Sequence, residues 1–314
     1  MRIRSLQHWY ARLVLLPLCS CLACSEGELV AAPVRQSLQT IPSEMIVGGG
    51  GLNLAASEAG KADGQPIVFI HGFSGNRLTW ERQFSGPLAA EFRLVAYDLR
   101  GHGASDKPLE AVRYTNAALW AEDLAAVIRA KNLNRPVLVG WSYGGYVIAD
   151  YIRKFGDSNI GGVVFLGSVT KNGTPEAVEF LTPEVLALFP NVLSADVEKS
   201  IEGTRALTRM FANPLSDDAW EIAYGSAMMV PPAVRAAMFS RVLDNDDVLA
   251  SIRVPTLVIH GTSDRIVRVS AARHTARSVP KATLLLYDGV GHAPHLEVPE
   301  RLSRDLAEFV RARR

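Results

Sequence analysis

Residues 136–152 read PVLVGWSYGGYVIADYI, and this stretch decides the fold. A run of aliphatic residues is followed by three glycines around one serine, after which an apolar pattern resumes at once. Ser142 is therefore either a small residue in a tight turn or a nucleophile displayed on a sharp turn between a strand and a helix. Gly140 and Gly144 favour the nucleophile, because glycines let two backbones approach closely at such a turn.

Short apolar runs bounded by glycine or proline recur along the chain on both sides of Ser142. Such runs, rich in valine, isoleucine and leucine, are typical of strands buried on both faces of a parallel sheet. They lie at residues 66–72, 92–98, 136–140, 161–167, 255–261 and 282–289. Two earlier segments, MIVGG and LNLAAS, are candidates for an antiparallel pair at the leading edge of the sheet.

Helical patterns lie between several of these runs. The clearest covers residues 116–133, with Trp120, Leu124 and Val127 on one face and Asn116 placed to cap the first turn. This alternation predicts an α/β fold with a doubly wound, mostly parallel sheet. In such folds the chemistry takes place at the carboxyl ends of the strands.

The alternation stops between residues 170 and 251. Only helical patterns punctuated by proline and glycine remain there. We therefore expect a helical cap at 170–251, inserted into a core made of residues 44–169 and 252–314. The apolar residues of this segment are expected to serve mostly as the cap's own core.

The first 24 residues have the layout of a secretory signal. Arginines precede an apolar run from residue 13 to residue 23, which is shorter than the roughly 20 apolar residues that span a bilayer. All three cysteines of the chain lie in this leader, so no disulfide is expected in the folded part. Residues 25–43 are polar and contain proline, as is typical of a tether.

The segments LCSC and CLAC within the leader resemble the lipobox of bacterial lipoproteins, although the second has Cys21 where an aliphatic residue is usual. The resemblance implies that Cys21 or Cys24 is lipidated. We therefore expect an exported protein anchored to a membrane, in the bacterial periplasm or at the cell surface. The alternative is a plain secreted or periplasmic protein that is cleaved near Ala23.

The composition excludes several classes of function. The chain has 33 basic and 32 acidic residues, a net charge of +1, and no basic stripe of the kind that binds nucleic acid. No HExxH motif or cysteine–histidine cluster indicates a metal, and no glycine-rich nucleotide motif is present. We expect no metal, no cofactor and no nucleic-acid partner, and the oligomeric state is left open.

A serine hydroxyl needs a base to take its proton, so a histidine should follow Ser142 in the chain. His292 lies in the loop after the last expected strand, where the order serine, acid, histidine places the base. His295 is the alternative base. Asp264 follows the penultimate strand and is the leading candidate for the acid. Asp288 is the competing candidate, but it is more simply explained as a residue that caps or forms the turn of its loop.

Five segments resemble, in order, the signature segments of the α/β-hydrolase family: FIHGFSGNRLTW, DLRGHGASDKP, GWSYGG, HGTSDRIV and GVGHAPHLEVPERL. The chain is most similar to the cofactor-free haloperoxidase and esterase branch, which has a helical lid. The resemblance implies Ser142 as nucleophile, Asp264 as acid and His292 as base. It also implies an oxyanion hole made by the backbone N–H groups of Phe73 and Tyr143.

The expected activity is hydrolysis of a small, uncharged or weakly polar carboxylic ester through an acyl-enzyme on Ser142. Epoxide hydrolases and haloalkane dehalogenases of this fold carry aspartate at the position of this serine. Lactonases, carbon–carbon bond hydrolases and perhydrolases use the same triad and are the alternative enzymes. The alternative to an enzyme is a receptor-like binding module, which would bind a ligand in the same pocket without catalysis.

Overall fold

An eight-stranded sheet forms the centre of the structure, in the order β1-β2-β4-β3-β5-β6-β9-β10. The computed structural model describes residues 40–212 and 216–312, so the expected leader, most of the expected tether, Cys21 and Cys24 lie outside the described residues. The strands are β1 (Glu44–Val47), β2 (Asn53–Gly60), β3 (Pro66–Ile70), β4 (Arg93–Tyr97), β5 (Val137–Trp141), β6 (Gly162–Leu166), β9 (Thr256–Gly261) and β10 (Thr283–Tyr287).

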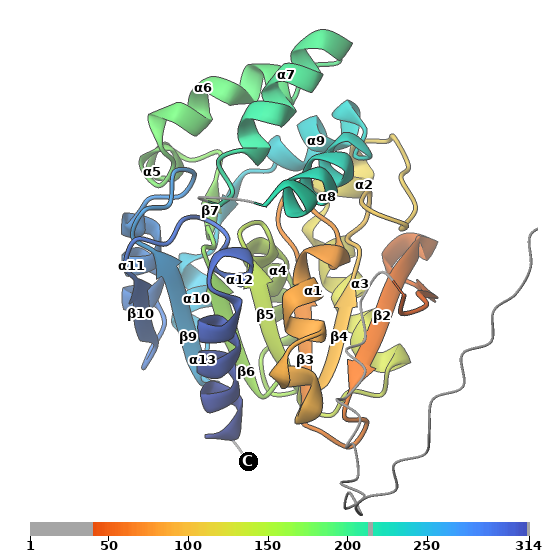
Figure 1. Ribbon diagram of the computed structural model, residues 1–314, viewed down its shortest axis with the longest axis vertical. Helices are drawn as coiled ribbons and strands as arrows, with labels where there is room; N and C mark the ends of the chain where they lie inside the picture. The colour runs from red at the N-terminus through yellow and green to blue at the C-terminus, as the bar shows by residue number, and fades with distance from the viewer. Residues whose placement is uncertain (1–39, 213–215, 313–314) are drawn as a thin grey trace, which may run out of the picture. The chain divides into compact units, whose positions relative to one another are not determined.

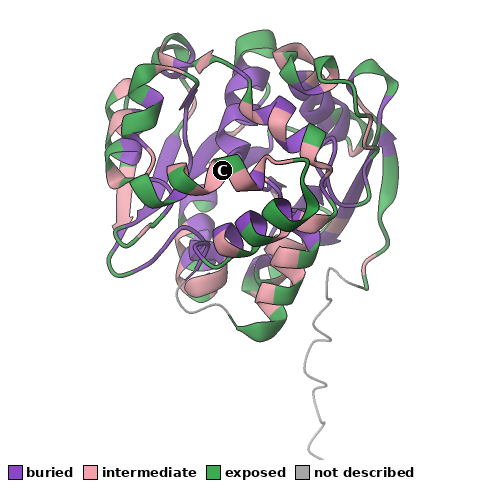
Figure 2. Cartoon of the chain, turned by 90° about the horizontal axis from the view of Figure 1, so that it is seen from above, coloured by how far each residue is buried: buried purple, intermediate pink, exposed green. Residues whose placement is uncertain are grey.

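The sheet is parallel except at its leading edge. β1 pairs antiparallel with β2, and β2 pairs antiparallel with β4. The other neighbouring strands all run parallel. The six apolar runs are therefore confirmed as strands, and the antiparallel edge pair is confirmed as well. Every residue of β3, β5, β6 and β9 is buried, as Figure 2 shows in purple.

Helices cover both faces of the sheet (Figure 1). On one face α1 (Glu81–Phe84), α12 (Pro294–Glu297) and α13 (Pro299–Arg311) pack against one another. The other face carries α3 (Ala117–Ala130), α4 (Gly144–Phe155), α10 (Asp246–Ser251) and α11 (Val269–Ser278). Shorter elements are α2 (Val112–Thr115) and the 3₁₀ turns η1 (Gly49–Gly51), η2 (Arg77–Trp80) and η3 (Pro87–Ala90).

The start of α3 follows the expectation from the sequence. The side chain of Asn116 accepts a hydrogen bond from the backbone N–H of Ala118 at 3.0 Å, which satisfies one donor that the first turn leaves unpaired. Among the helices of the described residues, none combines the length and the apolar character that a membrane crossing requires.

The inserted segment between β6 and β9 forms the expected helical cap, which lies above the sheet in Figure 1. Its helices are α5 (Pro175–Glu179), α6 (Pro183–Val192), α7 (Val197–Thr208), α8 (Asp217–Met228) and α9 (Pro232–Phe239). The Thr182–Pro183 pair starts α6, because the threonine side chain accepts from Val185 N at 3.2 Å and the fixed φ of proline suits the first helical position.

A short strand pair closes the base of the cap, where only helical patterns were expected. β7 (Lys171–Asn172) pairs antiparallel with β8 (Leu243–Asp244), joining the segment that leaves the core to the segment that returns to it. A strand of two residues has no alternation of side chains, so no pattern in the sequence marks it. α10, at the end of the segment assigned to the cap, packs against α4 and α11 of the core.

The first turn of α4 approaches the sheet at very close range. A Cβ atom on Gly144 would lie 2.6 Å from the carbonyl oxygen of Ile70 at the end of β3. A Cβ atom on Gly140 would lie 2.7 Å from the backbone of Gly144. Both distances are shorter than any normal contact, so only glycine lets α4 begin directly beside β3 and β5.

We expect Gly144→Ala to lower the free energy of unfolding by roughly 1–3 kcal/mol, because the new methyl group meets backbone that cannot move aside. The matched control is Gly225→Ala in α8, where a Cβ atom would meet nothing within 4 Å. That change should stabilise the protein by up to about 1 kcal/mol through helix propensity. Denaturant unfolding measures both, and equal effects of the two substitutions would contradict the packing argument.

Candidate active site

Ser142 occupies a sharp turn between β5 and α4. Its φ angle is +51°, a left-handed conformation that non-glycine residues rarely adopt and that is often found at functional sites. Two backbone hydrogen bonds fix the turn: Ser142 N donates to Leu166 O, and Gly145 N donates to Ser142 O, both at 3.0 Å. The half-buried side chain of Ser142 lines a cavity beneath the cap.

His292 faces the same cavity from the loop after β10. Its Nδ1 atom lies 2.8 Å from Oδ2 of Asp264, in the loop after β9. When Nδ1–H donates to this carboxylate, Nε2 is left unprotonated and able to accept a proton. The backbone of His292 is fixed as well, because the indole Nε1–H of Trp141 donates to its carbonyl oxygen at 2.8 Å.

The Asp264 carboxylate is held in place on both oxygens. Oδ1 accepts hydrogen bonds from the N–H groups of Ile266 and Val267, at 2.8 and 2.9 Å. The side chain is fully buried. Burial acts to raise the pKa of Asp264, but the neighbouring His292 outweighs it and holds this pKa below its usual value. The acid is therefore present as a carboxylate that can stabilise a cationic imidazole.

A second histidine contacts the same carboxylate. His260 Nε2 lies 2.9 Å from Val267 O and 3.3 Å from Oδ2 of Asp264. Burial lowers the pKa of His260, so the ring is neutral and donates from Nε2. Its place four residues before Asp264, at the end of β9, was visible in the sequence, but no motif pointed to this contact.

The structure brings Ser142, Asp264 and His292 together as expected from the sequence. Ser142 and His292 line one cavity, although no hydrogen bond joins their side chains among residues 40–212 and 216–312. Such a bond is often long in an enzyme without substrate and tightens when substrate is bound. The geometry thus places a serine hydroxyl and an imidazole on one cavity, with a carboxylate that orients the imidazole.

The two competing residues have other partners. His295 is fully buried beneath Trp141, with its ring centroid 4.5 Å from that indole, and its Nε2 atom pairs with Thr79 Oγ1 at 2.7 Å. The exposed Asp288, in the loop after β10, accepts a hydrogen bond from the hydroxyl of Thr262, in the loop after β9, at 3.1 Å. Neither side chain lines the Ser142 cavity.

The residues expected to form the oxyanion hole lie on either side of Ser142. Phe73 follows β3, Tyr143 precedes the first turn of α4, and both line the cavity. In the part of the chain that the structure describes, neither backbone N–H makes a hydrogen bond. The positive end of the α4 dipole also favours negative charge near Tyr143. Both donors are therefore available to an oxyanion.

Tyr143 is held by a buried ion pair that the sequence analysis missed. Arg241, between α9 and β8, donates to both carboxylate oxygens of Asp150 on α4, at 2.6 and 2.8 Å. The same guanidinium donates to the hydroxyl of Tyr143 at 3.1 Å. These partners are 91 and 98 residues from Arg241 along the chain, and no local pattern links them.

The cavity beside Ser142 is small and mainly apolar. Its volume is about 60 Å³. Aliphatic and aromatic side chains of the cap and the core form most of its wall, including Val185, Phe189, Leu207, Phe211, Phe239 and Val267. Such a wall excludes water from the reacting bond and favours an apolar ligand.

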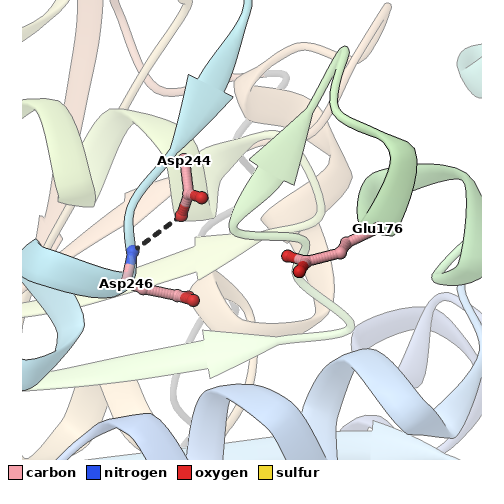
Figure 3. A group of neighbouring side chains, drawn as sticks. All are labelled: Glu176, Asp244 and Asp246. Atoms are coloured by element: carbon pink, nitrogen blue, oxygen red, sulfur yellow. Dashed lines mark hydrogen bonds between the residues drawn. The ribbon is translucent and has the colours of Figure 1, made fainter.

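One group of carboxylates in the described residues has the spacing of a metal site: Glu176, Asp244 and Asp246 (Figure 3). The ammonium group of Lys171 already lies among them, 2.5, 3.3 and 2.7 Å from their oxygens. Burial acts to lower the pKa of Lys171, but the three carboxylates outweigh it and raise this pKa. The group is therefore a salt-bridge cluster at the base of the cap.

Comparisons with known proteins agree with this geometry. The family model described as alpha/beta hydrolase fold matches residues 65–299. The non-heme chloroperoxidase of Streptomyces lividans is 31% identical over 277 residues, which cover 83% of this chain and 97% of that protein.

Solved structures extend the similarity to the fold as a whole. The esterase RhEst1 from Rhodococcus sp. ECU1013 is 32% identical, with a TM-score of 0.83 over 87% of this chain and 100% of that one. Est816, described as an N-acyl homoserine lactone degrading enzyme, is 27% identical, with a TM-score of 0.68 over 85% of this chain and 100% of that one.

Three buried histidines make stability depend on pH. Burial lowers the pKa of His71 to about 4, and the pKa values of His102 and His295 to about 3. The unfolded chain takes up these protons near pH 6.5, whereas the native protein does not. Between pH 6.5 and 5 the free energy of unfolding should therefore fall by about 1.4 kcal/mol per pH unit for each histidine.

Urea unfolding at pH 7 and at pH 5 measures this loss. Equal free energies of unfolding at the two pH values would show that these side chains are not held neutral in the native state.

Proposed function

Because the chain belongs to the α/β-hydrolase family, we propose that it is a serine hydrolase that cleaves carboxylic esters through an acyl-enzyme on Ser142. The observation that carries the proposal is that Ser142 and His292 line one mainly apolar cavity, with the imidazole bonded at 2.8 Å to the buried carboxylate of Asp264 behind it. The similarity to an esterase over nearly the whole chain supports the same activity.

In the proposed reaction, Oγ of Ser142 attacks the ester carbonyl carbon while its proton passes to Nε2 of His292. The carbonyl oxygen becomes an oxyanion, which accepts hydrogen bonds from the N–H groups of Phe73 and Tyr143. The bond to the alcohol oxygen then breaks, and that oxygen takes the proton from His292. Water, activated by the same imidazole, attacks the acyl-enzyme, releases the acid and restores the serine.

Two features of the site lower the barrier. Asp264 stabilises the imidazolium that forms in each half of the reaction and keeps the ring in the useful tautomer. Each fixed N–H donor to the oxyanion contributes about 3 kcal/mol in enzymes of this kind. Arg241 supports one of these donors indirectly, because it bonds to the hydroxyl of Tyr143.

The cavity favours a small apolar acyl group. Its volume of about 60 Å³ and its apolar wall suit a short acid and give a charged acid no partner beyond the catalytic groups. Esters of short acids should therefore be the better substrates.

Lactone hydrolysis is a second candidate, since a lactone is a cyclic ester cleaved by the same chemistry. The similarity to Est816, which is described as degrading N-acyl homoserine lactones, favours its inclusion in any substrate panel. A receptor without catalysis would keep the cavity but would not react covalently at Ser142. Covalent labelling therefore distinguishes a serine hydrolase from a receptor.

Ser142→Ala should abolish labelling by a fluorophosphonate and lower ester hydrolysis by roughly five to six orders of magnitude, because no other group can form the acyl-enzyme. Ser85→Ala, at the end of α1 and outside the cavity, is the control and should retain labelling. Gel detection of the label and a spectrophotometric ester assay measure both effects. Undiminished turnover in Ser142→Ala would rule out the mechanism.

Asp264→Asn should lower the rate by about 10⁴-fold, through loss of imidazolium stabilisation and of the correct tautomer. Asp288→Asn is the matched control: it makes the same chemical change in a neighbouring loop and should leave the rate within a factor of about two. Steady-state kinetics on one ester compares them. A large loss of rate in Asp288→Asn, with little loss in Asp264→Asn, would instead assign the role of the acid to Asp288.

A further inference from the structure

A second cavity lies beside the Ser142 cavity, beyond two aromatic side chains. Its volume is about 230 Å³, larger than the first. It is bordered by α8 of the cap and, in the core, by the loop after β3, η2 and α12. Trp141 and Phe211 line both cavities, so one aromatic wall separates the second cavity from the catalytic groups.

The two halves of this wall differ in how firmly they are held. Trp141 is 2% exposed, bonds through Nε1 to the carbonyl of His292, and packs on His295. Phe211 belongs to the cap segment after α7, is 5% exposed, and is held by apolar contacts alone, with its ring centroid 5.5 Å from that of Trp141 and 6.2 Å from that of His292. Truncation of the Phe211 side chain would therefore join the two cavities, while Trp141 stays in place.

The proposed chemistry fixes the direction in which the alcohol leaves. The oxyanion must face the N–H groups of Phe73 and Tyr143, whereas the alcohol oxygen must face His292 to receive its proton. The imidazole of His292 is in contact with both aromatic residues of the wall. In the proposed reaction the alcohol oxygen therefore lies close to the two aromatic residues that separate the cavities.

The two cavities also differ in polarity. The first is mainly apolar, whereas the second combines apolar side chains with polar and charged ones. The apolar ones include Leu78, Ile222 and Leu296, and the polar and charged ones include Asn76, Ser226, Glu81, Arg82 and Asp218. An alcohol with an apolar body near the ester oxygen and polar groups further out matches this lining.

We propose that the second cavity binds the alcohol portion of the ester and that Phe211 sets the size of alcohol that is accepted. The inference rests on the proposed function and names its substrate class: esters of a short acid with a bulky, amphipathic alcohol. Phe211 is then a specificity-determining residue that touches the substrate on the alcohol side of the scissile bond.

The test compares methyl acetate with 2-phenylethyl acetate, which share an acid and differ in the alcohol. Phe211→Ala should raise kcat/KM for 2-phenylethyl acetate relative to methyl acetate by about tenfold or more. Ile222→Trp, which fills the second cavity from α8, should lower the same ratio by about tenfold or more. If both variants leave the ratio at its wild-type value, the assignment is wrong.

Phe189→Ala is the matched control, because Phe189 lines the first cavity and not the second. This substitution should change the ratio of kcat/KM for methyl hexanoate to kcat/KM for methyl acetate. It should leave the ratio of the kcat/KM values for the two acetates unaltered. A change in the ratio of the acetates as large as that in Phe211→Ala would mean that the alcohol lies in the first cavity, which contradicts the proposal.

A binding measurement separates this inference from the proposed function. Binding of 2-phenylethanol to the Ser142→Ala protein, followed by saturation-transfer NMR, requires no turnover and should be lost when Ile222→Trp is added. Loss of binding supports the second cavity even if no ester is cleaved. Retained binding overturns the inference, even when fluorophosphonate labels Ser142 and the esterase activity is confirmed. Circular dichroism of each variant establishes that it has folded.

Discussion

The close contact between the start of α4 and the end of β3 is the constraint on which the site depends. Because Gly144 lies against the carbonyl of Ile70, the chain must turn sharply after β5, and Ser142 takes up a φ angle of +51°. This turn directs the serine side chain into the cavity and leaves the N–H of Tyr143 without a partner in the described chain. The placement of the serine and the free N–H group proposed for catalysis thus follows from one packing requirement.

The cap is fastened to this same helix. Arg241, on the segment returning from the cap, pairs with Asp150 on α4 and bonds to the hydroxyl of Tyr143. A buried ion pair of this kind contributes little net stability but is costly to break, so it fixes a geometry. The salt-bridge cluster around Lys171 also joins the two segments at the base of the cap, although its carboxylates are at least partly exposed. The cap residues that line the cavities therefore keep a defined position relative to Ser142 and His292.

The features that could be predicted from the sequence are those that depend on residues close together along the chain. The buried strands, the cap of α3 by Asn116, and the loops that carry Asp264 and His292 each leave a local pattern. The contacts of Arg241 and the wall formed by Phe211 join residues far apart in the chain, so no local pattern marks them. The β7–β8 pair, two residues on each strand, is too short to show a period. The membrane anchor expected at Cys21 or Cys24 stays a prediction.

The central claim, a covalent intermediate on Ser142, is tested most directly by trapping it. The enzyme is mixed with saturating para-nitrophenyl acetate, quenched in acid during turnover, digested and analysed by mass spectrometry. The account predicts one acetyl group on the peptide that contains Ser142, together with a burst of para-nitrophenol equal to the enzyme concentration. An acetyl group on another residue, or turnover without any acetylated peptide, would contradict it.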